Sequence, residues 1–522
     1  MYTLGIDLGT TNCVAAVYQH GKKRSLPLDG GRFYLPSVVS FRNDKPTLIG
    51  RPAKSSLPVF PENTVSSAKR FMGNRKKQYH ILEKDYTPVD VSAIILRHIV
   101  EMAQKSLGEE IWDAVITVPA YFNDEQRADT KRAGEQAGLN VLLLLPEPTA
   151  AAISYGIGRS RDQTIMVYDL GGGTFDVSIL QVKGHDFRVI AVGGDSRLGG
   201  DDFDEAIVGW IEKHIENETG KNILTGMGRE HFVARQKLKE AAEQAKKELS
   251  DADEAEIVIP EILGTSVQLN LNLQRFNSLI QPLIDRSILR MKDVLRDAGM
   301  TADDIDRVIM VGGSTRVRAV REAITAEIRE PYSDESPDEA VAWGAAIRAA
   351  YLDTPDTISG INVIEATAHT LGVGMYVDSG DDNKELELVP MIPRNTNYPC
   401  SSAILGFTIR DYQEVIAVGV FRGEERLAHN NDYLGELAMH IKRPRVQPVP
   451  VANLFQLDNN GILHFKVIDI PLDEGCHPSI IKLLSDSDNS DGALDIALLE
   501  SLIQSGVLPT PEEVSIDIGN CL

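Results

Sequence analysis

Two glycine-rich turns, each preceded by an aspartate, carry the residues of this sequence that could do chemistry. The first turn follows Asp7 in the run LGIDLGTTNCV, and the second follows Asp169 in the run VYDLGGGTFDV. In both runs an apolar segment ends at the aspartate and a second apolar segment follows the turn, which predicts a β-hairpin. Backbone N–H groups in such a turn can bind phosphate oxygens, and an aspartate at the strand end suits a hydrated Mg²⁺ ion.

A single turn of this kind most often serves only to reverse the chain. Two copies change this interpretation, because each copy could hold one end of a polyphosphate from opposite sides. The order of residues is the same in both copies: an apolar residue, aspartate, leucine, glycine, glycine or threonine, and then a second apolar strand. The sequence therefore predicts a duplicated, two-lobed domain for phosphoryl transfer.

Glu147 is a further candidate, because it lies between two prolines after the apolar strand predicted at 141–145. A glutamate held in this way could orient a water molecule or a metal shell, or it could merely cap the alanine-rich helix that follows. Lys69 precedes an apolar pair, and such a cation is most often part of a solvated helix end.

The elements needed to position these residues follow from the hydrophobic pattern. It predicts helices over 89–108 and 230–249, and a strand over 308–311 that ends in a Gly-Gly-Ser turn able to wrap a nucleotide. The helix at 230–249 carries alternating charges, so its simplest interpretation is a surface helix with i,i+4 ion pairs.

The second part of the chain has a different pattern. Residues 353–360 are polar with proline and glycine, which is typical of a linker. From 371 to about 465 the pattern predicts short strands, typical of a small antiparallel β-domain, at 384–390, 403–409, 414–421, 434–441 and 463–468. In the remainder we expect one helix at 493–505 and a flexible acidic loop at 485–492, because this loop lacks carboxylates where a calcium loop needs them.

Composition and charge narrow the function classes. The chain has 522 residues, enough for two or three domains, and its formal net charge of -23 argues against binding nucleic acid. The cysteines, Cys13, Cys400, Cys476 and Cys521, are widely scattered, which favours reduced thiols. Because a strand is predicted almost at the N-terminus and no apolar run is long enough to span a bilayer, we expect a cytoplasmic protein without a signal peptide or membrane segment.

The assembled motifs resemble the DnaK-type heat-shock chaperone family. Over 1–350 the resemblance rests on GIDLGTTN, VITVPAYFNDEQR, EPTAAAISYG, VYDLGGGTFDVSIL, GGDSRLGGDDFD, LKEAAEQAKKELS, VGGSTR and SPDEAVAWGAAI, and beyond 361 on IPRNTNYP, FRGEERLAHNN and LGEL. The resemblance implies an α/β two-lobed actin-like (ribonuclease-H-like) ATPase domain followed by a small antiparallel β-sandwich that binds peptide. The short chain is also similar to the HscC-type members of the family.

The resemblance implies a role for each matching residue, with ATP or ADP and Mg²⁺ as cofactors. Asp7 and Asp169 would hold Mg²⁺ through water, Lys69 would bridge to the γ-phosphate, Glu147 would orient the attacking water, and Thr174 would lie near the γ-phosphate. The implied phosphate contacts are Thr10, Thr11, Gly172, Gly173 and Thr174. The implied adenosine contacts are Glu243, Lys246, Lys247, Ser250, Gly313, Ser314, Arg316 and Asp338. Further implied cofactor-binding residues are Gly9, Asn12, Gly171, Gly200 and Gly312.

The implied domain layout is an ATPase domain at 1–353, a linker at 354–366, a β-sandwich at 367–470 and a short tail at 471–522. The tail is too short for the family's helical lid at 1.5 Å per helical residue. Tyr376 and Ile409 match the arch of the family's peptide site and Ile416 its floor, and these bulky residues predict a narrow pocket.

Two departures from the family pattern concern coupling and partners. The family's linker is an unbroken aliphatic stretch followed by aspartate, whereas Asn362 interrupts it here and Glu365 takes the acidic place. Leu143 stands where the family has an arginine that contacts J-domain co-chaperones. The resemblance therefore implies unfolded polypeptide clients and a nucleotide exchange factor, whereas docking of a standard J-domain partner is in question.

Three functions follow as hypotheses. The leading one is an ATP-hydrolysing chaperone whose bound nucleotide sets the affinity for extended peptides. The second is a nucleotide-dependent regulator or decoy with weak interdomain coupling, suggested by Asn362 and Leu143. The third is a small-molecule kinase, because sugar kinases share the superfold. The rate of ATP hydrolysis would distinguish them. Acceleration by peptide favours the chaperone, acceleration by a sugar favours the kinase, and a rate that neither ligand changes favours the regulator.

Overall fold

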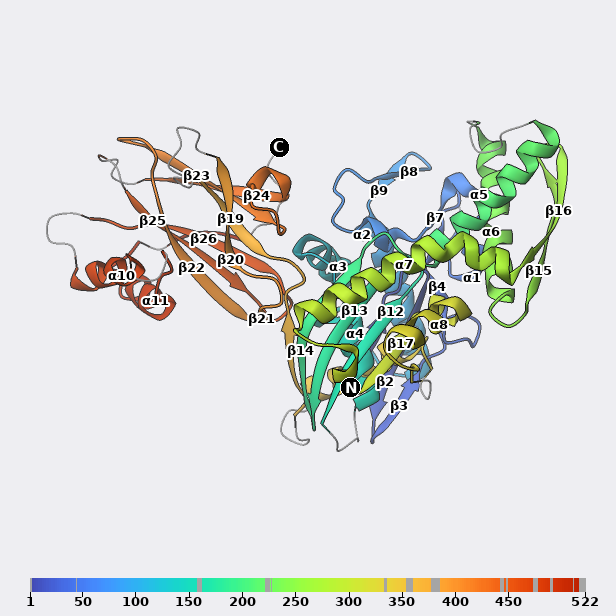
Figure 1. Ribbon diagram of the computed structural model, residues 1–522, viewed down its shortest axis with the longest axis horizontal. Coiled ribbons are helices and arrows are strands. Elements are labelled where there is room, and N and C mark those ends of the chain that lie inside the picture. The colour runs from blue at the N-terminus through green and yellow to red at the C-terminus, as the bar shows by residue number, and fades with distance from the viewer. Residues whose placement is uncertain are drawn as a thin grey trace. The chain divides into compact units, whose positions relative to one another are not determined.

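A computed structural model of the chain, drawn in Figure 1, divides into two compact units, Met1–Ile364 and Glu365–Leu522. The structure describes residues 2–43, 45–156, 162–220, 226, 228–332, 336–353, 360–376, 385–441, 446, 449–472, 477–488, 492–509 and 511–515. The proposed four-part division of the chain stays a prediction, and residues 354–359 of its linker lie outside the described residues.

The first unit is built on two mixed sheets. One sheet has the order β11 (Asn140–Pro146), β10 (Asp113–Val118), β1 (Leu4–Asp7), β2 (Asn12–Gln19) and β3 (Lys22–Ser25), with β4 (Leu35–Pro36) paired to β2. The other has the order β17 (Arg307–Val311), β12 (Gln163–Leu170), β13 (Phe175–Lys183), β14 (Asp186–Asp195) and the first three residues of β18 (Asn362–Ala366). The remainder of β18 and β21 (Asn397–Tyr398) belong to the second unit. Each sheet contains one of the two predicted hairpins, β1–β2 and β12–β13, as antiparallel neighbours.

Smaller strand pairs complete this unit. They are β5 (Val38–Ser40) with β6 (Leu48–Ile49) and β7 (Thr64–Ser66), β8 (Tyr79–Ile81) with β9 (Lys84–Tyr86), and β15 (Glu254–Ile262) with β16 (Thr265–Asn272).

The helices of the first unit cover the sheets. They are α1 (Arg51–Lys54), α2 (Pro88–Leu107), α3 (Asp124–Gln136), α4 (Glu147–Gly156), α5 (Gly200–Thr219), α6 (Arg229–Glu248), α7 (Leu273–Asp297), α8 (Arg318–Glu327) and α9 (Ala340–Asp353). Short 3₁₀ turns lie at Pro61–Asn63, Ala68–Phe71, Ala302–Asp304 and Gly313–Arg316. The hydrophobic pattern thus predicted α2 and α6 to within one residue at each end.

Helices α4 and α9 join the two sheets. Helix α4 contacts β12 and β13, α9 contacts β1 and β2, and the two helices contact each other. Gly344 permits this close approach, because a Cβ atom there would lie 1.7 Å from the Ala150 carbonyl oxygen. The joined sheets place the two hairpin turns across a common cleft.

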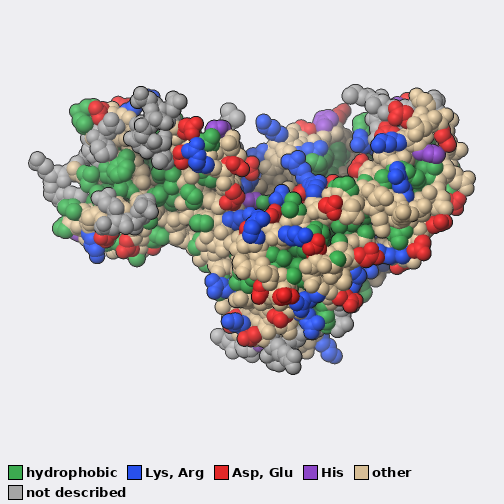
Figure 2. Space-filling model, viewed as in Figure 1, with side chains coloured by type: hydrophobic (Ala, Val, Ile, Leu, Met, Phe, Trp, Pro, Cys, Tyr) green, Lys and Arg blue, Asp and Glu red, His purple; other side chains and the backbone are tan. Residues whose placement is uncertain are grey.

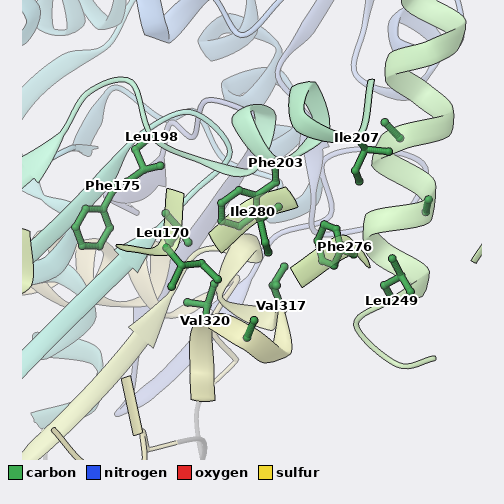
Figure 3. Close-up of a cluster of buried hydrophobic side chains, with 14 of the residues drawn as sticks. Leu170, Phe175, Leu198, Phe203, Ile207, Leu249, Phe276, Ile280, Val317 and Val320 are labelled. Atoms are coloured by element: carbon green, nitrogen blue, oxygen red, sulfur yellow. The ribbon is translucent and has the colours of Figure 1, made fainter. Parts of the chain in front are cut away.

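A single buried cluster supports the loops on one side of this cleft. Figure 3 shows Leu170 and Phe175, which flank the second glycine-rich turn, in the same cluster as Phe203 of α5. Val317 and Val320, which follow the Gly-Gly-Ser turn, pack into this cluster as well. The second glycine-rich turn, the start of α5 and the segment after the Gly-Gly-Ser turn are distant in sequence, and all three are anchored in the same hydrophobic cluster.

The last residues of the predicted linker are not an open loop, because they form strand β18. In the first unit, Asn362, Val363 and Ile364 pair in parallel with Asp186, Phe187 and Arg188 of β14. In the second unit, Glu365 and Ala366 pair with β21.

The second unit contains two four-stranded sheets that share a hydrophobic core. Their orders are β20 (Leu386–Ile392), β19 (Leu371–Tyr376), β23 (Val415–Arg422) and β24 (Asp432–His440), and β22 (Cys400–Phe407), β25 (Pro450–Leu457), β26 (Leu463–Asp469) and β27 (Glu512–Ser515). A 3₁₀ turn lies at Ala428–Asn430. The predicted strands overlap β20, β22, β23, β24 and β26, whereas no strand was predicted at β19, β21, β25 or β27.

The C-terminal segment folds onto the second sheet of this unit. Helices α10 (Pro478–Asp488) and α11 (Ile496–Gln504) bury Leu483 and Leu499 in one cluster with Ala452 and Leu454 of β25. Between the helices, Leu494 N–H donates to the Ala403 carbonyl at 2.9 Å, so this segment extends the open edge of β22. Strand β27 pairs with β26 at the opposite edge.

The expected acidic loop at 485–492 is wrong for residues 485–488, which belong to α10; residues 489–491 lie outside the described part. The helix extends through Ser487 because Ile480 and Leu483, three residues apart, bury one helical face.

Within the described ranges, we find no helix of the length and apolar character needed to span a bilayer. On the face seen in Figure 2, acidic side chains and lysine and arginine side chains are interspersed over the surface.

Candidate active site

A cleft of about 980 Å³ lies in the first unit and collects residues from both hairpins. The predicted site residues that line it are Asp7, Gly9, Thr10, Thr11, Asn12, Lys69, Glu147, Asp169, Gly171, Gly172, Thr174, Glu243, Lys246, Lys247, Ser250, Gly312, Gly313, Ser314, Arg316 and Asp338. Gly173 and Gly200 lie beside the cleft rather than in its lining, where Gly173 contacts Thr10 and Gly200 contacts Ser314. The residues predicted for one nucleotide site are therefore brought together.

The two glycine-rich turns face each other closely. A Cβ atom at Gly172 would lie 1.8 Å from Thr11 Oγ1, and one at Gly173 would lie 2.8 Å from Thr10 Cγ2. Thr11 Oγ1 is buried and has no hydrogen-bond partner among the described residues. A buried hydroxyl without a partner is costly, and a phosphate oxygen would satisfy it. The cradle therefore fits a polyphosphate.

A buried ion pair lies at the centre of the cleft. Lys69, in the 3₁₀ turn after β7, places its Nζ atom 2.5 Å from Glu147 Oε1. Glu147 begins α4 directly after β11, so the strand end and the flanking prolines fix its position. Both side chains are buried, at 4% and 8% exposure. The interpretation of Lys69 as a solvated helix end is thus wrong. Glu147 does stand at the start of a helix, and it makes an ion pair there as well.

Carboxylates surround this pair. Asp7 ends β1 and accepts a hydrogen bond of 3.0 Å from the Thr117 hydroxyl. Asp169, in β12, pairs directly with Asp176 of β13 across the second hairpin. Asp176 also accepts a 2.8 Å hydrogen bond from the Tyr121 backbone N–H.

The electrostatics of the site favour a bound cation. Burial, followed by the charge of Glu147, raises the pKa of Asp7 and of Asp176 to about 7 and raises the pKa of Asp169. Burial alone would lower the pKa of Lys69, but the charges of Glu147 and Asp7 outweigh it and raise this pKa. One ammonium group, that of Lys69, thus faces four buried carboxyl groups, those of Asp7, Glu147, Asp169 and Asp176. The carboxyl groups outnumber the positive charges around them, so a bound cation would be stabilised.

This donor set fits Mg²⁺ held mainly by water and phosphate. The described residues hold no group of three or more His, Cys, Asp or Glu side chains suited to a metal ion. Mg²⁺ commonly keeps several waters and uses one or two carboxylates together with substrate phosphates. Asp7 and Asp169, at the ends of the two strands, are the residues that would hold it.

At the other end of the cleft, α6 and the Gly-Gly-Ser turn face each other. Lys246 Nζ lies 2.8 Å from Asp204 Oδ1 and donates to the Gly200 carbonyl at 2.9 Å. Ser314 Oγ donates to the Gly171 carbonyl at 2.8 Å, and Arg316 pairs with Asp338.

Glu243 of α6 lies 2.8 Å from Lys54 of α1. The interpretation of the 230–249 helix as a plain surface helix is therefore wrong, although its i,i+4 pair between Glu243 and Lys247 is present.

Several residues in or beside the cleft escaped the sequence analysis. Asp176 could have been found by counting across the hairpin, because the turn places it directly opposite Asp169. Asp204 lies within the recognised GGDSRLGGDDFD segment, yet its partner Lys246 is remote in sequence. Tyr34, Arg318 and Arg321 line the cleft as well, and no local pattern marks them.

The residues predicted for peptide binding lie in the second unit. Tyr376 ends β19 and Ile409 follows β22, and their side chains are 52% and 53% exposed. Ile416, on β23, packs partly buried against the core shared by the two sheets. Their role in peptide binding stays a prediction. Leu143 lies on β11 of the first unit and is partly buried.

Two opposed glycine-rich turns, a buried lysine–glutamate pair and a surplus of carboxyl groups give this cleft the features of a polyphosphate-binding site. A family model described as "Hsp70 protein" matches residues 3–480. The chain therefore belongs to the Hsp70 family, which confirms the resemblance to DnaK-type chaperones. Members of this family bind ATP and ADP with Mg²⁺, are ATPases, and act as chaperones on unfolded polypeptides together with co-chaperones.

Proposed function

We propose that this protein is an ATP-dependent chaperone, which hydrolyses ATP in the cleft of its first unit to control the binding of extended polypeptides by its second unit. In this proposal the first unit is the actin-like ATPase domain and the second is the peptide-binding β-sandwich. The observation that carries the proposal is the buried pair of Lys69 and Glu147 between the two opposed turns.

The side chains have distinct tasks in hydrolysis. The turns at Thr10, Thr11 and Gly172 bind and orient the phosphates, and Glu147 accepts a hydrogen bond from the attacking water and so aligns it. Lys69 neutralises charge that develops on the terminal phosphate. Mg²⁺, held by Asp7 and Asp169, supplies further charge neutralisation when bound. Phosphoryl transfer to water depends mainly on such positioning and charge stabilisation.

The folded C-terminal segment supports fast exchange of peptide. Its apolar residues, including Leu483 and Leu499, are buried against the β22–β25–β26 sheet. They serve as a cover for that sheet, and a segment committed in this way does not also act as a helical lid. We therefore infer that this segment does not trap a bound peptide and leaves it free to dissociate rapidly.

The first test is the steady-state rate of ATP hydrolysis with Mg²⁺, with and without a short apolar peptide. We expect slow hydrolysis that peptide accelerates. The variant Glu147→Gln should bind ATP but lose about 10²- to 10³-fold in hydrolysis rate, as is usual when one stabilising group is removed. The matched control Glu216→Gln, an exposed position on α5, should hydrolyse ATP at the wild-type rate. Equal rates for the wild type and Glu147→Gln would refute the proposal.

A second candidate function is a nucleotide-dependent regulator that binds partner proteins without folding clients. It is favoured by the linker, in which Asn362 interrupts the aliphatic run and Glu365 is 7% exposed. Hydrolysis that is indifferent to peptide would favour this candidate. Stimulation by peptide would exclude it.

The partners and the location of the protein belong to the same proposal. We propose unfolded polypeptides as clients, a nucleotide exchange factor as partner, and the cytoplasm as location. Leu143 lacks the charge that the family's arginine offers to J-domain co-chaperones, so a partner of that kind would bind weakly at this position.

A further inference from the structure

Tyr34 supplies an aromatic wall to the nucleotide cleft from the lobe opposite to α6. It lies directly before β4, and its side chain lines the cleft together with Asp338 and Arg316. Asp338 itself reaches Gly313, since its Oδ1 atom would lie 3.8 Å from a Cβ atom at that glycine. Tyr34 is thus beside the residues expected to enclose the adenosine, and no predicted role includes it.

The backbone at Tyr34 is tied to the phosphate-binding turn. In β4, Leu35 and Pro36 pair with Cys13 and Asn12 of β2. Ser37 then donates its N–H to the Thr11 carbonyl at 2.8 Å and its hydroxyl to the Gly9 carbonyl at 2.7 Å. Because these bonds fix Tyr34 relative to the first turn, a nucleotide bound at that turn meets its ring in a set position.

The side chain is held as firmly as the backbone. The ring packs against the small cluster of Val14, Ala342 and Trp343, and the hydroxyl donates to Glu339 Oε1 at 3.4 Å. Burial, followed by the charges of Glu339 and Asp338, raises the pKa of Tyr34, so the phenol stays protonated and remains a donor. A rigid aromatic side chain loses little entropy when a ligand packs against it.

A hydrogen-bonded chain connects Tyr34 with a tryptophan. Glu339 accepts a hydrogen bond from the Ser25 hydroxyl through Oε2, and the Trp343 indole N–H donates to the same hydroxyl at 2.8 Å. Lys23 Nζ lies 4.6 Å from the centroid of the Trp343 ring. A displacement of Glu339 therefore changes the environment of Trp343.

We propose that Tyr34 is a nucleoside-binding residue, whose ring contacts the ribose and base while the turns hold the phosphates, and that Trp343 senses this contact. The inference rests on the proposed binding of ATP and ADP. It adds a contact from the first lobe to an adenosine site otherwise formed by α6 and the Gly-Gly-Ser turn. The nucleoside, and not only the phosphates, then holds the two lobes together.

The test compares ADP with inorganic pyrophosphate, which lacks the nucleoside, by calorimetric titration of the full-length protein. Aromatic contacts with bases contribute about 5- to 150-fold to affinity. We therefore expect Tyr34→Ala to weaken ADP binding by roughly tenfold and to leave pyrophosphate binding unchanged. The matched control is Phe33→Ala, since Phe33 is the exposed neighbour, at 42%, and is not part of the cleft lining.

A second readout follows the tryptophan. ADP should shift the fluorescence of the wild type, and pyrophosphate should not. In Tyr34→Phe the ADP affinity should stay within about threefold of the wild type, because the ring remains. The fluorescence shift should shrink, because the hydroxyl that contacts Glu339 is gone. The variant Trp343→Phe should abolish the fluorescence shift, which would show that Trp343 is the tryptophan that reports ADP binding.

The outcomes separate this inference from the proposed function. A wild-type protein that binds neither ligand would refute nucleotide binding itself. If the wild type binds ADP and Tyr34→Ala binds it equally well, or if Tyr34→Ala weakens pyrophosphate as much as ADP, the role of Tyr34 is refuted and nucleotide binding stands.

Discussion

The surplus of buried carboxyl groups predicts an unusual pH dependence of stability in the metal-free, nucleotide-free protein. Asp7 and Asp176 have folded pKa values of about 7 against an ordinary value of 3.8. Between these values the folded protein holds protons that the unfolded chain has released. The free energy of unfolding therefore falls as pH rises from about 4 to 7, by about 1.4 kcal/mol per pH unit for each such carboxyl group.

Glu147→Gln tests the cause of these shifts. The charge of Glu147 is the second contribution, after burial, to the raised pKa of both aspartates. Removing it should lower both pKa values. If each falls by about one unit, the pH-dependent loss of free energy between pH 5 and 8 shrinks by about 3 kcal/mol in total.

The measurement is urea unfolding at pH 5, 6, 7 and 8 in the presence of EDTA, followed by tryptophan fluorescence. All three tryptophans, Trp112, Trp210 and Trp343, lie in the first unit, so the signal reports on the unit that holds the site. The control is again Glu216→Gln, whose curve should run parallel to the wild type. A Glu147→Gln curve that also runs parallel to the wild type would contradict this account of the site.

Three further predictions concern other contacts. Lys54→Gln removes the partly exposed ion pair with Glu243, so ADP release in stopped-flow measurements should accelerate by about two- to fivefold; an unchanged rate would show that the pair does not hold the cleft closed. Thr117→Val removes a hydrogen bond to Asp7, so the Mg²⁺ concentration for half-maximal hydrolysis should rise roughly tenfold; a lower maximal rate with unchanged Mg²⁺ dependence would point elsewhere. Leu499→Asp buries an unpaired charge in α11, so circular dichroism should show early unfolding of the second unit while the tryptophan transition stays in place; a native-like second unit would mean that the C-terminal segment is not part of its core.

Local order along the chain was enough to determine the two hairpins and helices α2 and α6. A strand that ends in aspartate and a glycine-rich turn has few alternative structures, and the periodicity of α2 and α6 marks one buried face over many residues. The roles of Lys69 and Glu147 were different. Nothing in their local pattern excluded a solvated end or a cap, and only the family resemblance suggested that they act in one site.

Tertiary structure alone decided the contacts between segments distant in sequence. The bond from Tyr34 to Glu339 joins residues 305 positions apart, and it exists because β4 and the start of α9 reach the same edge of the cleft. The fold of the C-terminal segment is a second case. Its helical periodicity identifies an apolar face around Leu499, but a periodic face does not specify the surface that it covers. That surface, the outer side of the β22–β25–β26 sheet, is defined only once the strands have paired, because strand register decides which side chains face outward.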